Sequence, residues 1–161
     1  MHFLQPLPVN GHIQGVLRVQ VVAWALLSSR AMNAKAEEMI ARTQAFLMRV
    51  IAFCEGLPST LAAQRYKGQL MDAAGGLHSN YRSACRARST KEFIAKVGVA
   101  AEEADECVGW LETLRKAKCG NGPEQAALEQ EAVELTKILT ASQKTARRNE
   151  VMRARLSRQR R

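Results

Sequence analysis

Residues that could perform enzymatic chemistry are few in this sequence and are not spaced for it. The three histidines are His2, His12 and His78, and none stands three residues after a glutamate. The sequence has no Ser-His-Asp or Cys-His arrangement and no phosphate-binding loop of the G-x-x-x-x-G-K form. A lone His78 in a helical segment is more typical of a helix face than of a general base. We therefore predict no enzymatic activity and no cofactor.

A run of carboxylates raises the question of a metal site. Glu102, Glu103, Asp105 and Glu106 stand close together in the sequence. Dimetal carboxylate sites in helical bundles take Glu-x-x-His pairs from facing helices, and this sequence has no such pair. We predict that no metal is bound and interpret the run as surface charge or as a contact between subunits.

The four cysteines are far apart in the sequence. Cys54, Cys85, Cys107 and Cys119 form no C-x-x-C pair, and no histidine stands near them at metal-ligand spacing. Three of them fall on apolar helix faces, where a thiol behaves as a small apolar group. We predict reduced thiols in a cytoplasmic protein.

Positive charge is concentrated at the carboxyl-terminal end. The formal net charge is +9, but residues 32–146 carry 15 basic and 14 acidic side chains, which nearly cancel. The last fifteen residues carry seven arginines against Glu150, with no aromatic side chain to stack on bases. We expect this tail to be frayed helix or disordered when free, and to bind nucleic-acid phosphates with an affinity that falls with salt. Its predicted binding residues are Arg147, Arg148, Arg153, Arg155, Arg158, Arg160 and Arg161.

A second group of arginines lies in the middle of the chain. Arg82 and Arg86 are one helical turn apart, and Arg88 follows them. Two interpretations stay open. The group is either a solvated ridge that pairs with carboxylates of the next helix, or a ridge that contacts nucleic-acid phosphates.

These residues must be positioned by helices, because Ala, Leu, Glu, Lys and Arg dominate and only four prolines occur. Apolar spacing and helix-stop residues predict four helices, over about residues 33–55, 59–88, 90–117 and 123–148. Short turns join them, so the simplest arrangement is an antiparallel up-and-down four-helix bundle in the all-α class.

The third predicted helix is the most regular stretch of the chain. Ser89 and Glu92 have the spacing of a capping box, in which the serine hydroxyl accepts from the amide of Glu92 and that carboxylate reaches back to the serine amide. Apolar residues then recur every four or three positions, the spacing of a buried helix seam. The seam consists of Phe93, Val97, Ala100, Ala104, Cys107, Leu111 and Leu114.

Two further side chains have alternative interpretations. Asn80 falls on the seam of the second helix, where we expect either a hydrogen bond that fixes the register of the bundle or a contact with a ligand in a cavity shared with His78. Trp110 stands beside Leu111, where it either completes the bundle or packs across a subunit boundary.

Residues 1–31 differ in composition from the rest of the chain. The apolar run from Val16 to Leu27 contains Arg18 and Gln20 and is too short and interrupted to span a membrane. A signal peptide requires a basic residue before its apolar run, and no Lys or Arg precedes this one. We predict a flexible extension, or a start placed too early with Met32 as the first residue. The expected organisation is an extension at 1–31, a bundle at 32–148 and a basic tail at 149–161.

Three blocks of the sequence resemble a known family. They are SNYRSACRARSTKEFIAK at 79–96, EEADECVGWLETL at 102–114 and ELTKILTASQKTARR at 134–148. The resemblance, from Glu37 to Arg148, is to the bacterial four helix bundle proteins, also called 23S rRNA intervening-sequence proteins. It implies a ring-like homo-oligomer, pentameric in known members, without established catalytic activity. A related branch contains accessory proteins of diversity-generating retroelements, which bind a reverse transcriptase and nucleic acid.

The residues and the resemblance together predict a non-enzymatic bundle that self-associates and binds RNA or DNA through its arginines. The alternative is an oligomeric adaptor for a protein partner such as a reverse transcriptase.

Overall fold

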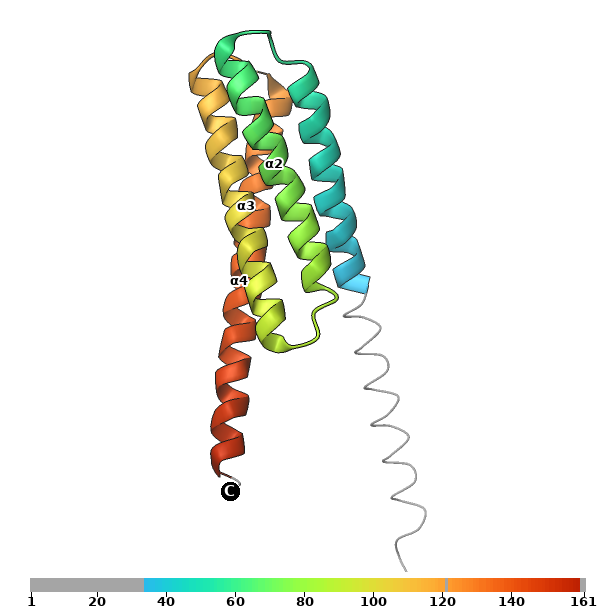
Figure 1. The fold of residues 1–161 in the computed structure, drawn as a ribbon, viewed down its shortest axis with the longest axis vertical. Helices are drawn as coiled ribbons and strands as arrows, with labels where there is room; N and C mark the ends of the chain where they lie inside the picture. Colours follow the sequence, from blue (N-terminus) through green and yellow to red (C-terminus); the bar gives the residue numbers. More distant parts are fainter. Residues whose placement is uncertain (1–33, 121, 160–161) are drawn as a thin grey trace, which may run out of the picture. The chain divides into compact units, whose positions relative to one another are not determined.

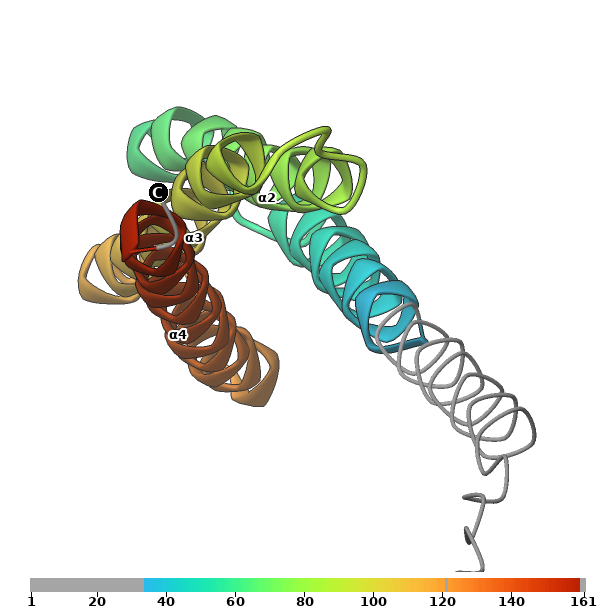
Figure 2. The same ribbon diagram turned by 90° about the horizontal axis from the view of Figure 1, so that it is seen from below.

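The computed structural model describes residues 34–120 and 122–159, so the predicted extension at 1–31 lies outside the described residues. Residues from Met39 onward form one compact unit. The first helix covers residues 34–55. It is followed by α2 (Leu61–Ala84), α3 (Thr90–Lys116) and α4 (Pro123–Gln159). Successive helices alternate in direction (Figure 1), and α3 lies between α2 and α4 when seen from below (Figure 2). The predicted all-α, antiparallel four-helix bundle is confirmed.

The ends of two helices differ from the prediction. α2 ends at Ala84 instead of continuing to Arg88, because the chain must turn out of the helix to reach the extended conformation of Ser89, the cap of α3. That turn is held by backbone bonds from Arg86 N to Ser83 O, 3.1 Å, and from Ala87 N to Ala84 O, 3.0 Å. α4 continues past the expected end at residue 148, as far as Gln159.

The cap of α3 is close to the predicted capping box. Ser89 Oγ accepts from Glu92 N at 3.1 Å, as predicted. The Glu92 carboxylate accepts from the amide of Arg88 at 2.9 Å, one residue before the predicted partner. The Arg88 amide, followed by the Arg88 charge, lowers the pKa of Glu92. The cap therefore joins the α2–α3 connection to the first turn of α3.

The core follows the predicted seam of α3 except at its first residue. Phe93 is only half-buried, and the neighbouring Ile94 is buried in its place. The ring lies at the end of the bundle, beside a surface hollow that it lines together with Ile138 of α4. From there the seam is fully inside the bundle, with Val97, Ala100, Ala104, Cys107, Leu111 and Leu114 all inaccessible to solvent.

Two glutamines of α4 hold it in register against α3. Gln125 Nε2 donates to Leu111 O at 2.8 Å, and Gln143 Nε2 donates to Ile94 O at 3.1 Å. Gly98 lacks the Cβ that would collide with the Gln143 amide. Sliding α4 along α3 would break both bonds and leave the buried amide nitrogen of Gln125 without a partner, which is costly. The two contacts therefore fix the point at which α4 leaves the bundle.

Asn80 does not fix the register as predicted. Its Nδ2 donates to Gly76 O at 3.0 Å, within α2. Gly76 instead has an interhelical role, because a Cβ there would lie 2.6 Å from the Glu103 carboxyl carbon on α3. The α2 backbone therefore lies close to the Glu103 side chain at Gly76.

Trp110 packs against α2 on one side of its ring. Its ring stacks on Tyr66 of α2, with centroids 5.7 Å apart and an angle of 24° between the planes. The side chain is half-buried. The stack joins α2 to α3 and leaves part of the indole at the surface.

Ion pairs connect the first helix and α3 to α4. Arg42 makes a bidentate pair with Glu131, at 2.6 and 2.9 Å. This interaction lowers the pKa of Glu131. Arg49 pairs with Glu124 at 2.9 Å. A further pair, Arg115 with Glu129 at 3.0 Å, joins α3 to α4.

His78 is held inside the bundle by a threonine of the first helix. Thr43 Oγ1 donates to Ile40 O at 3.0 Å and lies 3.0 Å from His78 Nδ1. Both contacts are satisfied together when Nδ1 carries a proton and donates to the hydroxyl. Burial, then the nearby Arg82 charge, lowers the pKa of His78. The neutral ring is therefore the form that the fold favours.

We expect mild acid to destabilise the bundle through His78. The unfolded chain takes up a proton near the ordinary pKa of 6.5, whereas the folded ring resists protonation. The free energy of unfolding should therefore fall as the pH drops below about 6.5. Urea unfolding at a series of pH values from 7.5 to 5.5 measures this. A His78→Gln variant should show a flatter profile, and an equally steep profile in that variant would contradict the assignment.

Candidate nucleic-acid interface

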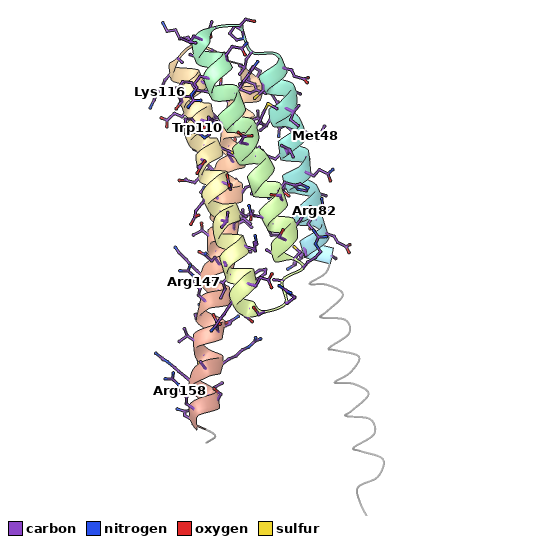
Figure 3. All side chains as sticks on the ribbon, in the orientation of Figure 1. Met48, Arg82, Trp110, Lys116, Arg147 and Arg158 are labelled. Atoms are coloured by element: carbon purple, nitrogen blue, oxygen red, sulfur yellow. The ribbon has the colours of Figure 1, made fainter. Side chains whose placement is uncertain are left out.

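α4 extends past the connection between α2 and α3, and its last turns lie outside the bundle (Figure 1). Arg147 lies near the point where α4 leaves the bundle, and Arg158 lies near the free end (Figure 3). We call residues 147–159 the overhang. Every residue of the overhang is exposed except Glu150, which is half-buried. The overhang is about 18 Å long at a rise of ~1.5 Å per residue.

The overhang is helical, although the tail was expected to be frayed or disordered. No glycine or proline occurs after Pro123 in α4. Arg, Ala, Leu, Met, Glu and Gln make up most of the overhang, and all of them have high helix propensity. The overhang also continues a helix that the bundle has already nucleated, so the cost of a new nucleus does not arise.

The arginines of the overhang gather mostly on one side of the helix. A rotation of about 100° per residue places Arg147 and Arg158 some 20–40° to one side of Val151. The same rotation places Arg155 and Arg148 about 40–60° to the other side. Lys144 continues this side toward the bundle. We call this set the arginine face; its members are Lys144, Arg147, Arg148, Val151, Arg155 and Arg158, all exposed.

The arginine face points away from the core of the bundle. The buried residues Leu128, Leu135 and Leu139 lie about 120–160° around the helix from Val151. Arg153 lies about 160° from Val151, on the side that faces the core farther up the helix. A shallow hollow marks the arginine face. It is lined by Arg147, Arg148, Val151, Met152 and Arg155.

The three arginines of the predicted ridge do not lie together on one helix. Arg82 lies in the last turn of α2, whereas Arg86 and Arg88 lie in the α2–α3 connection, and all three are exposed. Arg88 Nε lies 3.6 Å from Glu92 Oε2. For Arg88, the pairing with a carboxylate of the next helix is therefore the arrangement found. Arg160 and Arg161 lie outside the described residues.

The acidic run of Glu102, Glu103, Asp105 and Glu106 lies in α3. Glu103 is half-buried on α3, and burial, followed by Glu106, Glu102 and Asp72, raises the pKa of its carboxyl. Among the described residues, no group of three or more His, Cys, Asp or Glu is placed to hold a metal ion.

The cysteines are unpaired. Cys54, Cys107 and Cys119 are buried and Cys85 is exposed. Burial raises the pKa of Cys54 to about 11 and that of Cys107 to about 12. These two thiols are therefore protonated at neutral pH and poorly nucleophilic.

The residues that fix where the overhang leaves the bundle were not predicted from the sequence. Gln125 and Gln143 fix the register of α4, and Gly98 makes room for one of them. Their spacing could have identified them. The two glutamines are eighteen residues apart, or five helical turns, so they lie on the same side of α4. That side also carries the apolar stripe, where a polar residue calls for a partner.

Comparisons with known proteins agree with the fold. The family model for the 23S rRNA-intervening sequence protein matches residues 35–141. A solved protein of unknown function from the S23 ribosomal protein family of Bacteroides thetaiotaomicron is similar, with a TM-score of 0.60 and 22% identity over 68% of this chain and 98% of that chain. The curated proteins contain no match. Within residues 34–120 and 122–159, no helix is apolar over enough length to cross a membrane. The chain belongs to the 23S rRNA-intervening sequence protein family.

Proposed function

We propose that this protein is a non-enzymatic, self-associating four-helix bundle that binds RNA or DNA electrostatically through its overhang. The observation that carries this proposal is the arginine face. It places four exposed arginines within about 100° of one another on the overhang, where every described residue from 151 to 159 is exposed. Such a surface attracts phosphates and releases their counterions.

The charge of the rest of the chain supports the same site. Residues 32–146 are nearly neutral, so the tail supplies most of the excess positive charge. Arg82 and Arg86 lie at the same end of the bundle, next to the α2–α3 connection, and would add to the field around the overhang. Arg88 contributes less, because Glu92 neutralises it.

Self-association is supported by apolar side chains on the surface of the bundle. Met48 on the first helix is 57% exposed, and Met71 and Val99 are each 37% exposed. Trp110 on α3 is also partly exposed. Aromatic and Met side chains are enriched at interfaces between proteins. Light scattering at high micromolar concentration should give a mass several times that of one chain; a monomer would contradict this part of the proposal.

The electrostatic part is tested by a salt series on the full chain. Anisotropy of a labelled, generic 20-nucleotide probe is titrated at several salt concentrations. Four to six phosphate contacts predict a slope, in a plot of log affinity against log salt concentration, of about −3.6 to −5.4 for a DNA duplex and about −2.8 to −4.2 for a single strand. A slope near zero would show that phosphates are not what the protein contacts.

A second candidate function is that of an adaptor for a protein partner. It is favoured by Met152 and Leu156, which are 55% and 50% exposed on one side of the overhang. They stand one helical turn apart, as anchors for an apolar groove would. Replacing both by serine should leave nucleic-acid affinity unchanged and would weaken a protein complex. An overhang that loses nucleic-acid affinity with these changes would contradict a purely electrostatic site.

A further inference from the structure

The shape of the arginine face indicates which nucleic acid it fits. We infer that the overhang lies in the major groove of double-stranded DNA, with Val151 toward the floor of the groove and its arginines directed to the two phosphate walls. This inference rests on the proposed function and adds to it the class of nucleic acid and the mode of contact.

The arginines of the overhang lie on both sides of Val151. Arg147 and Arg158 lie to one side of Val151, and Arg148 and Arg155 lie to the other. A groove has phosphates on both sides and base edges between them. Two pairs of arginines on either side of a small apolar residue match that arrangement, because each pair faces one wall and Val151 can contact a thymine methyl group.

The overhang is a single helix, and its width matches the major groove of DNA. An α-helix with its side chains is about 10–12 Å across. The major groove of B-form DNA is about 12 Å wide and admits such a helix. The major groove of A-form RNA is deep and narrow, and side chains cannot read it. The overhang is able to enter a groove because its residues 151–159 are exposed all the way around the helix.

The composition of α4 does not favour single strands. Proteins that bind single-stranded nucleic acid stack bases on aromatic side chains. α4 contains no Phe, Tyr or Trp along its whole length from Pro123 to Gln159. The overhang therefore lacks the stacking platform that would favour unpaired bases over a duplex.

The test compares four probes on the full chain at one salt concentration. These are a 20-base-pair DNA duplex, an RNA duplex of the same sequence, and the corresponding DNA and RNA single strands. The DNA duplex should be bound about tenfold more tightly than the others. Equal binding to the RNA duplex, or tighter binding to either single strand, would overturn the inference.

Two single substitutions with the same change of charge locate the contact on the helix. Arg155→Gln removes an arginine from the arginine face, whereas Arg153→Gln removes one from the other side, two residues away. Both positions are exposed, and glutamine is a good helix former. Arg155→Gln should weaken binding to the DNA duplex by about fivefold to tenfold and reduce the steepness of the salt dependence by about 0.9. Arg153→Gln should weaken binding by less than about twofold.

The outcomes separate this inference from the proposed function. If both substitutions weaken binding equally, the overhang acts as a diffuse charge and the groove arrangement is wrong, while electrostatic binding stands. If removal of the whole overhang leaves binding to every probe unchanged, the proposed function itself is wrong, and the groove arrangement with it.

Discussion

Removal of residues 147–161 is expected to lower the affinity for a generic nucleic-acid probe by on the order of 100-fold at low salt. Seven arginines and one glutamate leave with this segment, so the formal net charge falls by six, from +9 to +3. The shortened chain keeps the Gln143 bond to Ile94 and the whole buried stripe of α4. Anisotropy titrations of the full and shortened chains, in the same buffer, measure the difference.

The control for this truncation keeps the charge and changes the apolar side chains of the overhang. Met152 and Leu156 are replaced together by serine, which leaves Val151 and all seven arginines in place. This variant should bind the probe within about twofold of the unchanged chain, because the phosphate contacts remain. Thermal melts of both variants should show that the bundle is folded. A shortened chain that binds as tightly as the full chain would remove the overhang from the proposed function.

Leu111→Ala is expected to cost the bundle about 2–5 kcal/mol of unfolding free energy. Leu111 is 0% exposed and belongs to the buried part of the α3 seam. Truncating it removes transfer free energy and leaves a cavity that close-packed neighbours cannot fill completely. Its backbone carbonyl still accepts from Gln125, so the loss reports on the side chain alone. Urea unfolding followed by circular dichroism gives the value.

Leu61→Ala is a matched control for Leu111→Ala. Leu61 is the first residue of α2 and is 89% exposed. The same chemical change there should alter stability by no more than about 0.5 kcal/mol. Comparable losses at both positions would mean that Leu111 does not lie in a close-packed core.

The side of each helix that is buried was largely predictable from the sequence. Val97, Ala104 and Leu111 were predicted to line the core from their spacing, and they do. Phe93 has the right spacing but is half-buried, because the bundle ends beside it. Spacing alone does not show where along α3 the neighbouring helices stop covering it. Ser89 was recognised as a cap because a cap depends on residues only three positions away.

Interactions between helices were predicted poorly. Asn80 was expected either to bond across the bundle or to contact a ligand, and its Nδ2 donates to Gly76 O, one turn away in the same helix. An amide near its own helix backbone can satisfy itself locally, so its position on a seam does not imply an interhelical bond. Gln125 and Gln143, which do bond across helices, were not singled out.

The sequence by itself determined four helices, their buried sides and the concentration of arginine near the carboxyl terminus, because periodicity, capping and charge depend on residues close together along the chain. Only the tertiary structure decided how α4 lies along α3. That register depends on contacts between residues far apart in the sequence, such as Gln143 with Ile94. The register in turn decides that α4 passes the end of the bundle and that the arginine face is left uncovered for a partner.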